Sequence, residues 1–328
     1  MTGGMDRSAQ KKSVALFIYG PTASGKSDFA LRLAQSIPAE IVNMDVAQCY
    51  VPLTIGTAKP EWRKAAVQHH LFDVISSARD CTVVEYRQLL EQAMTAIWRR
   101  GKLPIVVGGS GFYLRSLLFP PDQQLSVMNE FAISEEGSWE DLHAIDPCRA
   151  AQISKRDTYR ISRALAIWCA TGCKPSAYMP IYNPPCAGLV LNVTRSRKDL
   201  AARIETRTEA MLASGFVQEV AAVMGTAWEE FVQRKGFIGY RELFEYLRMS
   251  PSNRLLSNVR SQIALRTRQY AKRQATFWRS LERKIAQAQL VHKSEYPVVE
   301  TMVANLTEND EDSYIGLLHS RLFPFSYE

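Results

Sequence analysis

The chain has 328 residues, of which 46% are hydrophobic and 22% charged, and its formal net charge is +7. This length and composition indicate a globular protein with one large domain plus an insertion, or with two domains. We expect neither secretion nor a membrane partner, because no apolar stretch is long enough to span a bilayer and the first residues do not resemble a signal peptide. The six cysteines lack paired spacing, so we expect reduced thiols and a cytoplasmic location.

A phosphate-binding loop is predicted near the start of the chain. The apolar run Val14–Tyr19 is typical of a buried strand, and Gly20-Pro-Thr-Ala-Ser-Gly-Lys-Ser27 follows it directly. Glycines let the backbone approach phosphate oxygens, amide groups and a helix N-terminus point at the anion, the lysine adds a positive charge, and the serine hydroxyl can hold Mg²⁺. The residues expected to bind a diphosphate here are Gly20, Thr22, Ala23, Ser24, Gly25, Lys26 and Ser27, with Ser27 also the expected Mg²⁺ ligand.

Helices and strands alternate after this loop. The next helix is expected to bury one face, made of Phe29, Ala30, Leu33, Ala34 and Ile37. In chain order, we predict a helix over residues 28–37, a strand over 40–45, a helix from the capping box at Thr82 to Gly101, and a buried strand over 103–107 that ends in Gly108-Gly-Ser-Gly111. This alternation predicts an α/β fold with a parallel sheet core like that of P-loop NTPases.

The sequence changes character near Pro120, and helices without strands are predicted up to the pair Pro184-Pro185. We interpret residues 120–186 as a helical insertion domain between a first core part, 13–119, and a second core part, 187–290. The second part is predicted to begin with a strand at Leu189–Val193 and to continue as helices. Residues 291–328 are locally acidic and weakly periodic, and we assign this tail no function.

Positive charge is concentrated in one predicted helix of the second core part. Residues 254–284 hold nine Lys or Arg against one acid, Glu282, so the rest of the chain is close to neutral. Such a segment binds a polyanion, most simply a nucleic acid, or forms a solvated helix face, and composition alone does not separate the two. The spacing of Ile263, Tyr270 and Phe277 predicts that these side chains form its buried seam.

Asp45 is the one acidic residue at a predicted strand end near the phosphate loop. It could hold a metal or act as a base, and the loop alone does not choose between these roles. The chain has no Asp-Asp dipeptide, the pattern with which many prenyl transferases hold Mg²⁺-diphosphate. The residues His69, His70, Cys169 and Cys173 could in principle bind a metal, but without a C-x-x-C spacing we favour free cysteines.

An ordered set of motifs runs from residue 18 to about residue 280. Besides the phosphate loop, it comprises Asp45 with Gln48 and Tyr50, Ile55-Gly-Thr-Ala-Lys-Pro60, His69-His-Leu71 with Asp73, Gly101-Lys-Leu-Pro-Ile-Val-Val-Gly-Gly-Ser-Gly-Phe-Tyr113, Asp146-Pro147, Asp157 with Arg160 and Arg163-Ala-Leu165, Arg203 with Arg207, Ile238-Gly-Tyr-Arg-Glu242, and Thr267-Arg-Gln-Tyr-Ala-Lys-Arg-Gln274. In this set the chain resembles the tRNA dimethylallyltransferases, also called tRNA isopentenyltransferases.

The resemblance implies transfer of a dimethylallyl group from dimethylallyl diphosphate to the exocyclic amine of the adenosine 3′ of the anticodon, position 37, in tRNAs that read codons beginning with U. It implies Mg²⁺ as cofactor, a tRNA anticodon stem-loop as partner, and a monomer. By the same resemblance, the phosphate loop and Arg207 bind the diphosphate, Asp45 is the general base, and Ser110 supplies a hydroxyl at the reacting centre. The residues implied in tRNA binding are Gln48, Arg160, Arg268, Lys272 and Arg273, and the insertion is implied in tRNA contact.

The chain departs from the family pattern at several positions. Val46 replaces the usual serine after the catalytic aspartate, Ala166 replaces a glutamate, and Ser110 stands where threonine is usual. No cysteine follows Cys186, so the zinc finger of eukaryotic relatives is not expected and the bacterial type is indicated. Two alternatives remain: a small-molecule or nucleoside kinase that uses the same loop on ATP, and an RNA-binding protein with a degenerate catalytic site.

Overall fold

The computed structural model describes residues 13–120, 137–178, 180–291 and 296–322. The chain divides into two compact units, one formed by Met1–Leu114 with Pro185–Glu328 and the other by Arg115–Pro184. The second unit is inserted between two strands of the first.

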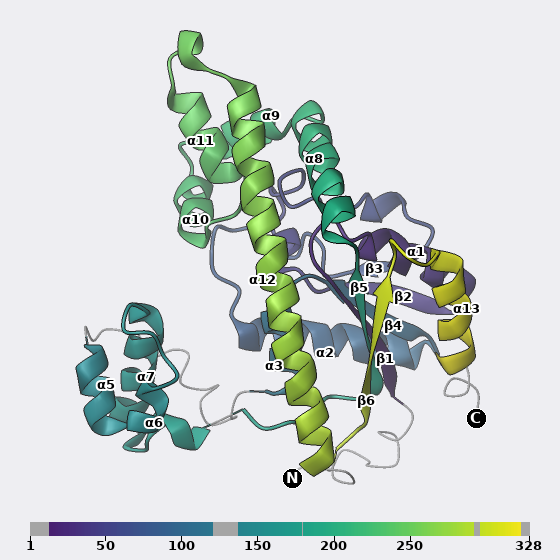
Figure 1. Cartoon of the computed structure of the whole chain (residues 1–328), viewed down its shortest axis with the longest axis vertical. Coiled ribbons are helices and arrows are strands. Elements are labelled where there is room, and N and C mark those ends of the chain that lie inside the picture. Colours follow the sequence, from purple (N-terminus) through teal and green to yellow (C-terminus); the bar gives the residue numbers. More distant parts are fainter. Residues whose placement is uncertain (1–12, 121–136, 179, 292–295, 323–328) are drawn as a thin grey trace. The chain divides into compact units, whose positions relative to one another are not determined.

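A parallel sheet of six strands forms the centre of the first unit (Figure 1). Its order is β3-β2-β4-β1-β5-β6, so β1 lies between β4 and β5, with Ile18 opposite Val107 on one side and Leu191 on the other. The predicted α/β class with a parallel sheet is confirmed. The strands are β1 (Val14–Tyr19), β2 (Ala39–Asn43), β3 (His69–His70), β4 (Leu103–Gly108), β5 (Ala187–Thr194) and β6 (Val299–Asn305).

Helices cover both faces of this sheet, as parallel strands require. On one face, α1 buries the predicted apolar side chains, and α13 adds Leu318 and Leu322 to the same cluster. On the other face, α2 contacts β2 and β4, and Trp278 of α12 stacks on Tyr19 of β1. The helices of this unit are α1 (Lys26–Ser36), α2 (Val83–Arg99), α8 (Arg197–Ala213), α9 (Phe216–Val223), α10 (Ala227–Lys235), α11 (Tyr240–Arg248), α12 (Leu256–Val291) and α13 (Glu311–Leu322), and α3 (Gly111–Leu118) joins the two units.

The core extends beyond residue 290, where the sequence analysis ended it and began the tail. Strand β6 pairs with β5, with Met302 opposite Leu191, and α13 packs into the core cluster. The alternation of apolar and polar residues in this segment is weak because β6 is an edge strand with only two fully buried side chains, Val299 and Ala304. Its partner strand is more than a hundred positions earlier in the chain, so no local signal connects the two.

The described part of the second unit, residues 115–120, 137–178 and 180–184, contains helices and no strand. The bounds of the unit are Arg115 and Pro184, and those expected for the insertion are 120 and 186. Its described helices are α5 (Trp139–Ile145), α6 (Pro147–Ala150) and α7 (Thr158–Thr171). They bury a small core of their own around Leu142, Ile161 and Leu165.

The buried side of α12 differs from the predicted seam. Ile263 is buried, but Tyr270 and Phe277 are only partly buried. The buried positions toward the end of the helix are instead Ala271, Gln274, Trp278, Leu281 and Ile285. This stripe advances by three or four residues, which is the spacing that a straight helix needs to keep one face inward.

Gly108 at the end of β4 is a site where we expect a large effect on stability. A Cβ atom there would lie 2.0 Å from the carbonyl oxygen of Met44, and neither backbone can move without disturbing β2 or β4. Gly108→Ala should therefore lower the free energy of unfolding by about 1–3 kcal/mol or more, as overpacking does. Gly316→Ala is the control, because its Cβ meets nothing within 4 Å and alanine favours the helix. Urea unfolding measures the stability of both variants. An unchanged midpoint for Gly108→Ala would show that a Cβ atom at this position does not clash with the backbone of Met44.

Candidate active site

A cavity of about 420 Å³ opens at the carboxyl ends of β1, β2 and β4. Ligands of parallel α/β proteins bind at this edge of the sheet, and the volume suits a small molecule. Its lining includes five of the predicted site residues: Thr22, Asp45, Ser110, Arg207 and Arg273.

The phosphate loop has the conformation that its glycines make possible. A side chain at Gly20 would lie 2.3 Å from the carbonyl oxygen of Val193, so only glycine fits there. Gly25 has a φ of 92° and caps α1, which begins at Lys26. The N-terminus of α1 and the side chain of Lys26 therefore meet the end of the loop, where an anion is stabilised.

Three arginines donate hydrogen bonds to three consecutive residues of this loop, Thr22, Ala23 and Ser24. Nε of Arg195 donates to the carbonyl of Ser24 at 2.8 Å, and Nε of Arg203 donates to that of Ala23 at 3.0 Å. Nη1 of Arg207 donates to Oγ1 of Thr22 at 3.1 Å. Arg203 and Arg207 share a face of α8, as their four-residue spacing predicts. The sequence analysis did not identify Arg195, which lies between the end of β5 and α8.

Two cations, Lys26 of the phosphate loop and Arg207 of the cavity wall, are removed from water. Burial, and to a smaller extent repulsion from Arg207, lower the pKa of Lys26 to about 8, although Asp45 and Asp28 act in the opposite direction. Burial also lowers the pKa of Arg207. Two desolvated cations close to one another favour binding of an anion between them, because its charge removes their repulsion.

Asp45 follows β2 and caps a short 3₁₀ turn, Val46–Cys49. Its Oδ1 accepts from the amide of Ala47 at 3.1 Å, and its own amide donates to Oδ1 of Asn43 at 2.8 Å. Nδ2 of Asn43 donates in turn to the carbonyls of Asp45 and Leu71, each at 2.9 Å. The buried Asn43 thus orients the catalytic candidate, and the sequence analysis missed it because it sits at the end of an otherwise apolar strand. Burial raises the pKa of the Asp45 carboxyl, although Lys26, the Ala47 amide and Arg207 act in the opposite direction.

The loop Thr54–Ala58 forms another wall of the cavity, through Gly56 and Thr57. The carboxylate of Glu219 on α9 accepts from the amides of Thr54, Ile55 and Gly56 at 3.0, 2.6 and 2.9 Å. From the other side, Nε2 of Gln48 donates to the carbonyls of Thr57 and Ala58 at 3.0 and 3.3 Å. The amide nitrogen of Gln48 therefore fixes this loop, and Gln48 does not line the cavity.

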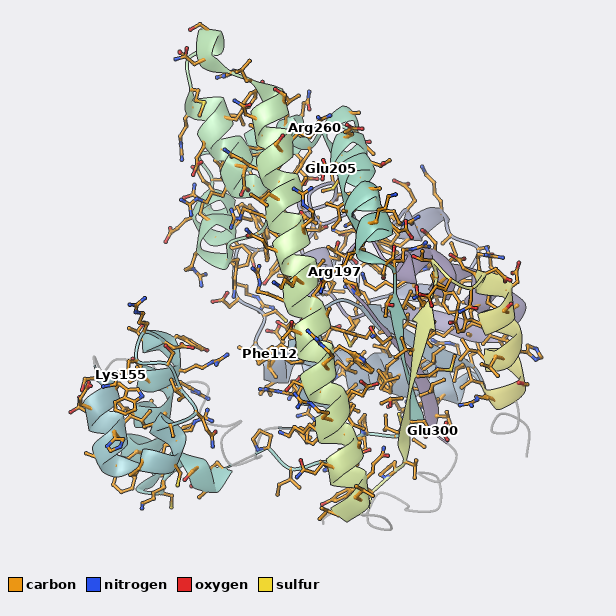
Figure 2. All side chains as sticks on the ribbon, viewed as in Figure 1. Phe112, Lys155, Arg197, Glu205, Arg260 and Glu300 are labelled. Carbon is orange, nitrogen blue, oxygen red and sulfur yellow. The ribbon has the colours of Figure 1, made fainter. Side chains whose placement is uncertain are left out.

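The predicted RNA-binding residues of α12 differ in their surroundings. Arg268 pairs with Glu205 of α8, and Arg260 pairs with Glu209; Figure 2 labels Glu205 on α8 and Arg260 on α12. Lys272 and Arg273 are exposed, and Arg273 also lines the cavity beside Tyr270, with its Cζ 5.7 Å from the ring centre. Much of the charge on this helix is therefore neutralised by neighbouring helices, and Lys272 and Arg273 present the more available cations.

Arg160 lies on α7 in the second unit. Its Nε is 3.3 Å from a carboxylate oxygen of Asp157, which caps that helix. Burial lowers the pKa of Arg149 in the same unit, and the charge of Arg160 lowers it further. This unit therefore has its own positive region.

The described residues contain no group of three or more His, Cys, Asp or Glu side chains that could hold a metal ion. His70 donates to the buried carboxylate of Glu40, and all six cysteines are free. No helix in the described part of the chain has both the length and the apolar character to cross a bilayer.

Comparisons with known proteins show the family of this chain. The family model "IPP transferase" matches residues 48–281, and the model "Isopentenyl transferase" matches residues 13–78. A tRNA dimethylallyltransferase of Geobacter sulfurreducens is 36% identical over 288 residues, which cover 84% of this chain and 92% of that protein. The chain belongs to the tRNA dimethylallyltransferase family.

Solved structures of this family share the fold. The full-length tRNA isopentenylpyrophosphate transferase of Bacillus halodurans is 26% identical, covers 96% of this chain and 97% of its own, and superposes with a TM-score of 0.61. A eukaryotic dimethylallyltransferase acting on tRNA, 24% identical, covers 96% of this chain and 80% of its own with a TM-score of 0.74. The prediction that this chain has a P-loop NTPase-like α/β fold is thereby confirmed.

Proposed function

We propose that this protein transfers the dimethylallyl group of dimethylallyl diphosphate to the exocyclic amine of adenosine 37 in tRNAs that read codons beginning with U, and releases diphosphate. The observation that supports this most directly is a cavity lined by the desolvated guanidinium of Arg207 and the carboxylate of Asp45. Lys26, a second desolvated cation, lies close enough to both groups for their charges to change its pKa. The cations suit a diphosphate leaving group, and the carboxylate suits an amine that must lose a proton.

The donor diphosphate is proposed to bind the phosphate loop residues Gly20 to Ser27 and Arg207. The hydroxyl of Ser24 is fully buried and has no hydrogen-bond partner among the residues that the structure describes, so it is available to a phosphate oxygen at the loop. Apolar side chains line another part of the cavity and suit the hydrocarbon end of the donor; they are Ile204, Met211, Phe237, Ile238 and Ile263.

Mg²⁺ is proposed as the cofactor. It retains water and binds through few protein groups together with substrate phosphates, so it needs no cage of carboxylates. Ser27 is exposed beside Lys26 at the start of α1 and would hold the ion, which would offset charge on the diphosphate.

In the proposed reaction the Asp45 carboxylate takes a proton from the adenine amine. The amine nitrogen forms a bond to the first carbon of the dimethylallyl group as the bond from that carbon to the diphosphate oxygen breaks. Lys26 and Arg207 stabilise the charge that grows on the leaving oxygen. Ser110 lines the same cavity and offers its hydroxyl at the reacting centre.

The tRNA is proposed to bind through its anticodon stem-loop to Lys272 and Arg273, with contributions from Gln48, Arg160 and Arg268 and from the insertion. The target base must leave its stack to reach Asp45, as in other enzymes that modify a base. We propose that the protein acts as a monomer in the cytoplasm.

The kinase alternative is not favoured. Phosphoryl transfer requires Mg²⁺ and the attacking group to be held together, usually by an acid at a neighbouring strand end, and β4 ends in glycines and Ser110. Incubation with a stem-loop RNA and either dimethylallyl diphosphate or ATP separates the candidates. We expect a mass gain on the RNA from the prenyl donor, whereas phosphate transfer would support the kinase and binding without product would support the degenerate enzyme.

A salt titration tests the basic helix. If Lys272 and Arg273 contact phosphates, Lys272→Ala with Arg273→Ala should weaken RNA binding across sequences and lower the slope of log K against log salt by about one unit per contact. Arg268→Ala should have the smaller effect, because Glu205 already partners that guanidinium. An unchanged slope in the double variant would indicate a solvated helix face.

A further inference from the structure

Gln274 is a buried polar residue on the basic helix α12, with 5% of its surface exposed. Its side-chain amide joins two loops. Oε1 accepts from the amide of Thr22 at 2.9 Å, and Nε2 donates to the carbonyl of Gly109 at 2.7 Å. These loops follow the neighbouring strands β1 and β4. One side chain therefore bridges the phosphate loop and the loop that leads into Ser110.

The surrounding contacts hold this amide in one orientation. The N–H group of Thr22 can only donate and the C=O group of Gly109 can only accept, so the positions of Oε1 and Nε2 cannot be exchanged. A side chain at Gly109 would lie 2.3 Å from Nε2 of Gln274. The hydroxyl of Tyr19 donates to the backbone carbonyl of Gln274 at 2.8 Å, which anchors this part of α12 to β1.

The two bridged loops bear groups that must act on one substrate pair. Thr22 belongs to the phosphate loop, and its hydroxyl accepts a hydrogen bond from Arg207. Ser110 belongs to the second loop, where it follows Gly109. Tyr270 and Arg273 of the same helix line the cavity. A change at Gln274 would therefore alter the separation of the leaving group from the reacting groups.

We propose that Gln274 is a positioning residue for prenyl transfer, and this inference rests on the proposed function. It touches neither substrate. Through its two hydrogen bonds it sets the distance between the phosphate loop and the Ser110 loop, and a misplacement of about 1 Å in a reacting group can cost roughly 10²-fold in rate.

Gln274→Met removes both hydrogen bonds while nearly keeping the length of the side chain. At saturating donor and RNA, we expect its single-turnover rate of prenyl transfer to fall by roughly 10²-fold, with RNA affinity little changed. Gln269→Met is the matched control, because Gln269 is exposed on the same helix. Equal rates for Gln274→Met and the wild type would overturn the inference.

Gln274→Glu provides a test that a loss of packing would not reproduce. An ionised carboxylate can accept from Thr22 but cannot donate to Gly109, whereas a protonated carboxyl can do both. The rate of this variant relative to wild type should therefore rise as the pH falls through the pKa of the introduced carboxyl. A pH-independent ratio would overturn the positioning role. If the wild type itself transfers no prenyl group, the proposed function fails, and with it the inference.

Discussion

Asp45→Asn should slow the chemical step of prenyl transfer by ~10²- to 10⁴-fold, with the affinities for donor and RNA largely kept. The amide has nearly the same size but cannot take a proton from the adenine amine. Its oxygen can still accept from the amide of Ala47, so the 3₁₀ turn should survive. Single-turnover prenylation of a stem-loop RNA measures the effect, with both affinities determined separately.

The pH dependence gives this prediction a second readout. Because burial raises the pKa of Asp45, the wild-type rate should fall with decreasing pH at a higher pH than for an ordinary aspartate, and Asp45→Asn should lack this limb. Asp312→Asn, exposed on α13, is the control. A normal rate for Asp45→Asn with saturating donor and Mg²⁺ would show that Asp45 is not the base, and rescue by Mg²⁺ would indicate a metal ligand.

Lys26→Ala and Arg207→Ala should each lower turnover by roughly 10²-fold or more, because we propose that both cations stabilise the diphosphate charge that grows in the transition state. Arg197→Ala is a matched control on α8, since Arg197 is exposed at the start of the same helix (Figure 2). Near-normal prenyl transfer by Lys26→Ala would contradict the diphosphate assignment.

Donor binding should also depend on pH through Lys26. With its pKa at about 8, Lys26 is partly neutral in the free protein above that pH, and a bound diphosphate favours its charged form. Donor affinity should therefore fall as the pH rises past about 8, and binding near that pH should take up protons. Calorimetry in buffers of different ionisation enthalpy measures the uptake, which Lys26→Ala should abolish.

The sequence predicted the phosphate loop, the parallel sheet and the helical insertion because each has a local pattern. A glycine-rich loop between an apolar strand and an amphipathic helix is complete within a few dozen residues. The apolar face predicted for the first helix is also a local pattern, and all five of its predicted side chains are buried. Asp45 was predicted from its place at a strand end, and the structure places it in the cavity with Thr22, Ser110 and Arg207.

The missed features depend on contacts between distant parts of the chain. Thr22 and Gln274 are 252 positions apart, and a glutamine on a basic helix has no pattern that predicts burial. Arg195 and Glu219 act by hydrogen bonding to backbone groups, so the identity of their partner residues provides no signal. The ion pairs of α12 were missed for the same reason. A count of charges in the sequence does not reveal that Arg268 has an acidic partner on α8.

The late position of β6 has a consequence for synthesis of the chain. Arg195 donates to the carbonyl of Ser24 in the phosphate loop and, through Nη1, to the carbonyl of Leu306 at 3.1 Å, just after β6. While the chain emerges from the ribosome, β5 has an open apolar edge and Arg195 lacks this carbonyl until residues 299–306 have been made. Exposed strand edges promote association between nascent chains. The phosphate loop therefore acquires its complete support only after residues 299–306 have been translated, and shortened chains that end before β6 should aggregate during synthesis.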